Sequence, residues 1–124
     1  MVYEHINPEY LDSIANGDNE LIREIVEMFS VQASEIYIEM TALSEKKDYQ
    51  ALGLLAHKAK SSVAIMGMTE LAVMLKTFEL NARESIGINE YTAFIERFRN
   101  DTKEAVRELH HLIKSRKGIH DDKY

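Results

Sequence analysis

The segment from Asp48 to Gly67 constrains the fold most, because it joins a helix start, a helix stop and a helical apolar period. Asp48 can accept a hydrogen bond as an N-cap, and Gly67 tolerates the left-handed backbone that ends many helices. Between them, side chains at about 100° per residue form one mainly apolar stripe. That stripe comprises Leu52, Leu55, Ala56, Ala59, Ser62, Val63 and Met66. We therefore predict a helix with this stripe in a core.

The opposite stripe of the same helix carries a histidine among small residues, where long charged side chains are usual. It comprises Gly53, His57, Lys60, Ser61 and Ala64. One interpretation is an ordinary histidine, exposed or packed against another helix. The other is a nucleophile that the active site of a second protein must reach, because neutral imidazole is a competent nucleophile near pH 7. Lys60 would then neutralise charge on the oxygens of a transferring phosphoryl group.

The residues around His57 resemble the signature of the histidine-containing phosphotransfer (HPt) family. The run AHKAKSS at positions 56–62 is similar to the family pattern A-H-x-L-K-G-S-S. His57 matches the phosphoacceptor, Lys60 the basic residue three positions later, and Gly67 the glycine ten positions later. The next predicted helix continues the resemblance with Leu71, Leu75, Glu79 and Arg83.

Two positions depart from the HPt pattern: Ala59 replaces the usual Leu, and Ser61 replaces the usual Gly. The first removes core volume that a neighbouring side chain could fill. Serine is the next-smallest polar residue, so we expect the imidazole to stay accessible. These departures also keep a second hypothesis open, an HPt-like interaction module that binds receiver or kinase domains without carrying phosphate.

The resemblance implies a phosphorelay. A receiver domain would offer its aspartyl phosphate to Nε2 of His57, which would pass the group to the aspartate of another receiver. Expected partners are the receiver domains of response regulators and of hybrid histidine kinases. The sequence has no kinase signature or Gly-rich phosphate loop, so we expect a phosphotransfer intermediate and not a self-sufficient enzyme. In this family Mg²⁺ belongs to the receiver, so no cofactor is expected here.

The resemblance also assigns roles to residues near His57. Gly53, Ser61 and Ala64 would shape the open space beside the ring, and Leu54 and Ile65 would contact the partner. Lys76, Glu79 and Arg83 match polar positions that the family places near the histidine. Either Glu79 or a water molecule would hold Nδ1–H and so fix the tautomer.

Composition predicts one domain over residues 1–118 and a frayed tail over 119–124. The chain has 124 residues, no cysteine and a net charge of −6, which argues against disulfides, thiolate metal sites and nucleic-acid binding. There is no apolar run of membrane-spanning length and no charged-then-apolar leader, so neither a membrane span nor a signal peptide is expected. The absence of cysteine fits the reducing cytoplasm, and the compact ends and the start at Met1 favour a free-standing protein, with a monomer as the default expectation. A di-metal bundle needs two Glu-x-x-His spacings, and only Glu108 to His111 provides one.

Capping residues and periodicity predict a short helix and four long ones. The expected helices cover residues 8–15 after the cap Asn7, about 19–46 after Asp18 or Asn19, the segment described above, 70–84 after Thr69, and 90–117 after Asn89, with Gly118 ending the last. Short connections between amphipathic helices make spatial neighbours antiparallel. The predicted fold is therefore all-α, an antiparallel up-down-up-down four-helix bundle with a short extra N-terminal helix.

Overall fold

The computed structural model describes residues 3–121, and within them the chain is all-helical, as predicted. The elements are α1 (Pro8–Ala15), α2 (Asn19–Glu45), α3 (Tyr49–Ile65), α4 (Thr69–Glu84), the short 3₁₀ helix η1 (Ile88–Glu90) and α5 (Tyr91–Asp121). Of the predicted tail, residues 122–124 lie outside the described part of the chain. Across the described residues, no helix combines the length and apolar content that crossing a membrane requires.

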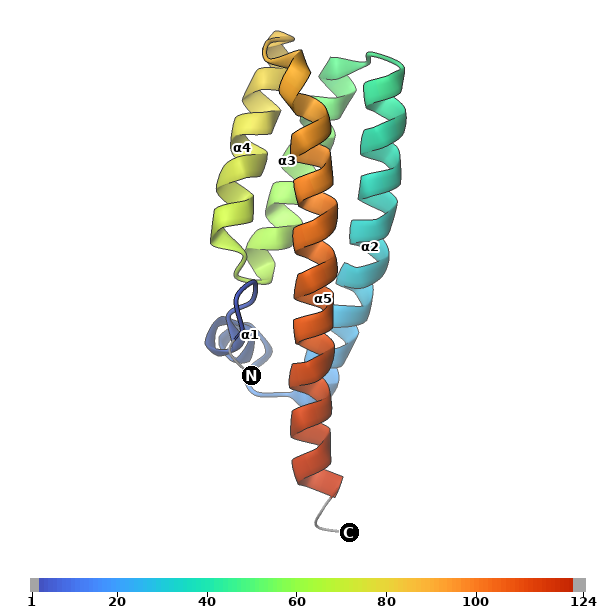
Figure 1. Cartoon of the computed structure of the whole chain (residues 1–124). Coiled ribbons are helices and arrows are strands. Elements are labelled where there is room, and N and C mark those ends of the chain that lie inside the picture. Colours follow the sequence, from blue (N-terminus) through green and yellow to red (C-terminus); the bar gives the residue numbers. More distant parts are fainter. Residues whose placement is uncertain (1–2, 122–124) are drawn as a thin grey trace.

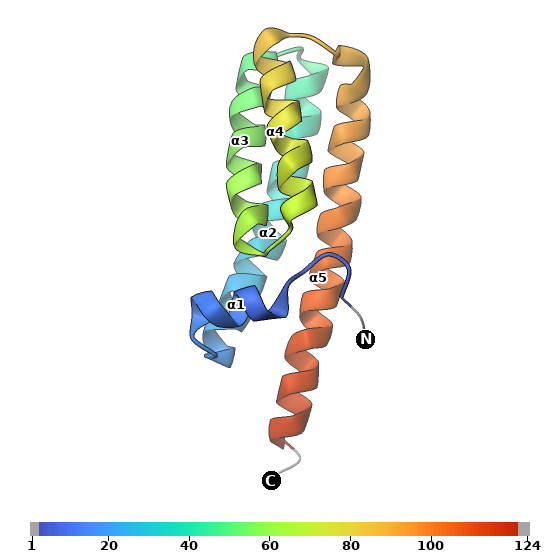
Figure 2. The same ribbon diagram turned by 90° about the vertical axis from the view of Figure 1, so that its left-hand side faces the viewer.

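The four long helices α2 to α5 lie side by side with their axes in one general direction (Figures 1 and 2). The closest packing joins α3 to α4 and α2 to α5, and further contacts join α2 to α3 and α4 to α5. Helix α1 lies across the lower ends of α3 and α4, and α5 extends beyond them (Figure 2). The turn between α3 and α4 is short, so the face of α3 that carries His57 lies beside the face of α4 that carries Glu79.

Three predicted caps start helices as expected. The side chain of Asn7 accepts a hydrogen bond from the backbone N–H of Tyr10, Asp18 starts α2, and Asp48 accepts from the backbone N–H of Ala51. Each cap satisfies a backbone donor that has no partner within its own helix. Between α2 and α3, Lys47 adopts a left-handed backbone (φ 59°), which lets the chain turn sharply.

Two features of the structure favour glycine at position 67, just after α3. Its φ of +76° lies in the left-handed region, where a side chain costs free energy. A Cβ atom at this position would also lie 2.9 Å from Cβ of Asn7, because the N-terminal segment crosses the turn here. The glycine therefore shapes a contact between the α3–α4 turn and the start of α1, and it does not adjoin the His57 ring.

Three predicted helix boundaries were wrong. Thr69 is the first residue of α4, and the cap position is occupied by the buried Met68, which has no side-chain oxygen to accept a capping hydrogen bond. Asn89 lies inside η1, which follows Gly87 in a left-handed conformation (φ 64°). The last helix continues through Gly118 to Asp121, because a glycine inside a helix costs only about 1 kcal/mol relative to alanine.

The predicted core stripe of α3 faces inward: all its members are buried except Ser62, which is half-buried. It packs on buried side chains of α4 such as Leu75 and Phe78, and Phe78 in turn contacts the ring of Tyr91 at the start of α5. Leu21 of α2, which the helical spacing of its apolar residues predicts to face inward, is exposed instead. Burial of this apolar surface is the main force holding the helices together.

Candidate functional site

His57 stands on the outer face of α3, and its side chain is 52% exposed. Nδ1 of the ring lies 3.0 Å from Oε1 of Glu79, which comes from α4. Glu79 is only 3% exposed, so a buried carboxylate on one helix holds a half-exposed imidazole on the next. The sequence left open whether Glu79 or water holds Nδ1, and this contact assigns the role to Glu79.

Three cations converge on the same carboxylate. Nη2 of Arg83 lies 2.9 Å from Oε2 of Glu79, and Nζ of Lys60 and of Lys76 lie 4.0 Å and 3.9 Å from Oε1. Arg83 therefore holds the oxygen that His57 leaves free. The two lysines are too far from the carboxylate for good hydrogen bonds, so their ammonium protons remain available to an incoming anion.

Glu79 is ionised in this setting. Burial alone raises the pKa of Glu79, but the hydrogen bond from His57, the charge of His57 in its protonated form and the charges of Lys76 and Arg83 outweigh it and bring the pKa below its ordinary value. A buried carboxylate without such partners would take up a proton instead. The site therefore has a fixed negative charge beneath the imidazole.

The ionised carboxylate determines the tautomer of His57. A carboxylate can only accept hydrogen bonds, so Nδ1 must be the donor in the 3.0 Å contact. In the neutral ring the lone pair is then on Nε2, the nitrogen farther from α4. Within the described residues Nε2 has no hydrogen-bond partner. This leaves a nucleophilic nitrogen open to another molecule.

Gly53 has a different role from the one predicted. It is buried, and a Cβ atom there would lie 3.0 Å from Cγ of Arg83 and 3.2 Å from the carbonyl oxygen of Glu79. The glycine allows α3 and α4 to approach one turn away from His57. It supports the site from within, and it does not line the open space beside the ring.

The other residues predicted beside His57 are exposed. The hydroxyl of Ser61 is turned back toward the helix, 3.5 Å from the carbonyl oxygen of His57, and Ala64 is open to solvent. Leu54 and Ile65 are 63% and 48% exposed, as partner contacts would have to be. Serine in place of the usual glycine therefore leaves the ring accessible.

Two apolar side chains lie on the side of α2 that its many polar residues predict to be solvated, across a groove from α3. Met28 and Val31 of α2 are strongly exposed and line a shallow groove together with Lys58 of α3. The same groove is bordered by Glu27, Glu35 and Glu39. The signal was present in the sequence as two apolar residues inside an otherwise polar stripe.

A second buried carboxylate, Glu108, pairs with His5, and the sequence did not indicate this pairing. Its Oε2 lies 2.8 Å from Nδ1 of His5, and its Oε1 accepts a hydrogen bond from the backbone N–H of His5. Nδ1 of His111 instead lies 3.0 Å from the hydroxyl of Tyr3. Glu108 and His111 thus both bind the N-terminal segment to α5. Among the described residues, no group of three acidic or histidine side chains is placed to hold a metal ion.

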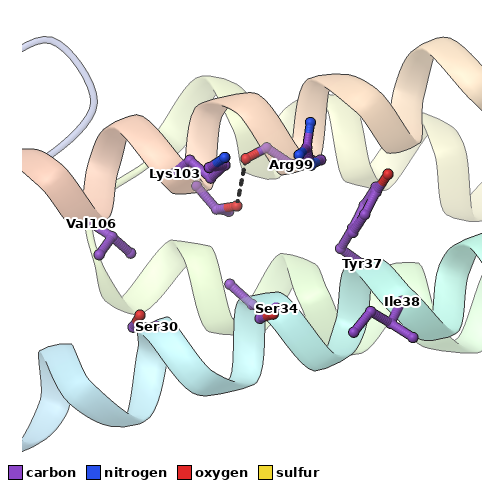
Figure 3. A pocket seen from close by; sticks show the side chains of 9 residues that line it. Ser30, Ser34, Tyr37, Ile38, Arg99, Lys103 and Val106 are labelled. Carbon is purple, nitrogen blue, oxygen red and sulfur yellow. Dashed lines mark hydrogen bonds between the residues drawn. The ribbon is translucent and has the colours of Figure 1, made fainter.

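A groove of about 490 Å³ lies between α2 and α5, on a different pair of helices from His57 (Figure 3). The guanidinium of Arg99 lies 5.4 Å from the centroid of the Tyr37 ring, and Thr102 donates to the carbonyl oxygens of Phe98 and Arg99. Neither a histidine nor a carboxylate lines this groove, so it lacks an acid–base or nucleophilic pair. We therefore assign the candidate site to His57.

Comparisons of the chain with models of protein families, with characterised proteins and with solved structures give no match. What His57 does is therefore inferred from the contacts around its ring and from the resemblance of residues 56–83 to the HPt pattern.

Proposed function

We propose that the protein is a phosphorelay carrier of the HPt type. His57 would accept a phosphoryl group from the aspartyl phosphate of a receiver domain and pass it to the aspartate of a second receiver. The observation that carries this proposal is the contact between Nδ1 of His57 and the ionised Glu79, which leaves Nε2 as an exposed nucleophile. An ordinary surface histidine does not need a buried carboxylate with three cations around it.

The chemistry at the site is a displacement at phosphorus. The lone pair of Nε2 forms the N–P bond while the bond between phosphorus and the aspartyl oxygen breaks, and the leaving electron pair returns to the carboxylate. Lys60 lies one turn from His57 on the same helix, where its ammonium can neutralise charge on the phosphoryl oxygens. Mg²⁺ that assists such a transfer would be bound by the receiver.

In this proposal α2 to α5 form the antiparallel up-down-up-down bundle of the HPt family, with α1 across one end. The partner surface would centre on His57 and include the exposed Leu54 and Ile65. Such a transient interface is modest in area, with an apolar centre and a polar rim. We propose that the protein acts as a monomer in the cytoplasm, together with its receiver partners.

The direct test is transfer of labelled phosphate from phosphorylated receiver domains to the wild type and to His57→Gln. We expect acid-labile label on the wild type and none on the variant. The matched control is His110→Gln, which removes an exposed histidine on α5 and should leave labelling unchanged. Several receivers are needed, because a single one can be the wrong partner.

The alternative is an HPt-like module that binds receiver domains without carrying phosphate, suggested by Ser61 at the usual glycine position. It predicts that a receiver binds the wild type and His57→Gln equally well while His57 takes no label from any phosphorylated receiver. Ser61 argues for the carrier instead, because its hydroxyl is turned back onto the helix and leaves the ring open.

A further inference from the structure

The hydrogen bond between His57 and Glu79 has a consequence for the phosphorylated state. In the neutral ring Nδ1 carries the only proton, because it donates to Glu79, and Nε2 attacks with its lone pair. When the N–P bond forms, the ring therefore holds a proton on Nδ1 and a phosphoryl group on Nε2, and it becomes a cationic imidazolium. Away from a protein this cation can lose its Nδ1 proton to water.

The fate of that proton governs the next transfer. If Nδ1 keeps it, the acceptor oxygen attacks phosphorus, the N–P bond breaks, and its electron pair returns to Nε2 of a neutral imidazole. If Nδ1 has lost it, the ring would have to leave as an imidazolate anion, a far poorer leaving group. A carrier that holds the proton is therefore ready to transfer without a general acid.

We propose that Glu79 retains the Nδ1 proton of phosphorylated His57, so that the protein carries its phosphoryl group as an Nε2-phosphorylimidazolium ready to leave. This inference rests on the proposed phosphoryl transfer and adds a role for one residue. Glu79 touches neither phosphorus nor the acceptor, so it is a positioning residue that acts through the ring. In both transfer steps the proton stays on Nδ1, and no proton has to enter or leave the site.

The surrounding charges agree with this role. Oε1 of Glu79 is the charged atom in direct contact with the ring, at 3.0 Å. Arg83 binds the other oxygen, and Lys60 and Lys76 lie about 4 Å from Oε1, so they hold the carboxylate ionised without replacing it beside Nδ1. On the α2 side, Glu27, Glu35 and Glu39 border the groove beside Lys58.

The test uses the full chain loaded with phosphate by potassium phosphoramidate, a small donor that needs no receiver. The ¹⁵N shift of Nδ1 in phosphorylated His57 is followed against pH, and its midpoint reports loss of the proton. Glu79→Gln keeps the size and an accepting oxygen but removes the charge, so its midpoint should fall by about one to three pH units. Glu70→Gln, an equal charge change at an exposed position of α4, should leave it unchanged.

A variant expected to shift the midpoint in the opposite direction separates the effect of charge from that of structural damage. Lys76 is half exposed and lies 3.9 Å from Oε1 of Glu79. Lys76→Gln leaves the carboxylate less neutralised, so the midpoint should rise by roughly half a unit. Circular dichroism checks that each variant is folded, and if Glu79→Gln is not, the direction of the Lys76→Gln shift decides.

The outcomes distinguish this inference from the proposed function. Equal midpoints in the wild type and a folded Glu79→Gln would overturn the role of Glu79, even if receivers still phosphorylate His57. A chain that loads from phosphoramidate but from no receiver would overturn the relay, while the midpoints would still report on Glu79. Failure of both phosphoramidate and phosphorylated receivers to load His57 would overturn both.

Discussion

Gly53 offers a test in which two explanations of this glycine predict opposite changes in stability for Gly53→Ala. If the glycine only kept space open for a partner, Gly53→Ala would stabilise α3 by about 1 kcal/mol, because alanine is the better helix former. The structure instead places its Cβ 3.0 Å from Cγ of Arg83 and 3.2 Å from the carbonyl oxygen of Glu79. Carbon atoms pack best at about 3.5–4.0 Å, so α4 or Arg83 must move.

The expected net change in stability is the cost of overpacking minus the gain in helix propensity. Overpacking of a tight contact costs about 1–3 kcal/mol, and the gain in helix propensity offsets about 1 kcal/mol of it. We therefore expect Gly53→Ala to lower the free energy of unfolding by about 1 kcal/mol, or the Tm by about 4 °C.

Urea unfolding followed by circular dichroism measures this directly. The matched control is Ser61→Ala on the exposed face of the same helix, which should change stability by less than about 0.5 kcal/mol. A gain of about 1 kcal/mol in Gly53→Ala would refute the claim that this glycine is required for the approach of α4.

Three further predictions concern other parts of the molecule. Lys60→Gln should lower the rate of phosphoryl acceptance by about 10- to 100-fold in a rapid-quench assay without changing the circular dichroism spectrum. Leu75→Ala, at a fully buried position, should lower the free energy of unfolding by about 2–5 kcal/mol in urea. Burial raises the pKa of Glu108, but hydrogen bonds from His5 and from the backbone bring that pKa below its ordinary value. Its charge therefore stabilises the fold above the unfolded-state pKa, and this contribution is lost as pH falls through the folded-state pKa. Glu108→Gln should thus cost about 1–3 kcal/mol at pH 7 and progressively less below about pH 4.5, in urea titrations at several pH values.

Local patterns were enough to predict the helices and the placement of His57. Asn7, Asp18 and Asp48 act within one helical turn of themselves, so their capping roles are readable from sequence. The apolar period of residues 48–67 likewise fixes which face of α3 is buried, and therefore which face presents His57. The boundary at Thr69 was predicted one residue late, because the burial of Met68 at the cap position depends on contacts with the rest of the core.

Contacts between distant segments could not be predicted in this way. Gly53 was expected to be open because its helical stripe is polar, but only the approach of α4 shows that Arg83 covers it. The pairing of His5 with Glu108 joins residues from opposite ends of the chain, and neither residue lies in a pattern that indicates the other. The choice of Glu79 over water at Nδ1 depends on how closely two helices pack, which spacing alone does not determine.

The most direct test of the central claim is to identify the atom that becomes phosphorylated. The ¹⁵N-labelled protein would be incubated with phosphorylated receiver domains and examined by NMR for coupling between ³¹P and a ring nitrogen of His57. The account predicts a single phosphoryl group on Nε2, with Nδ1 protonated. Phosphate on Nδ1, or on another residue while His57 stays unmodified, would contradict it.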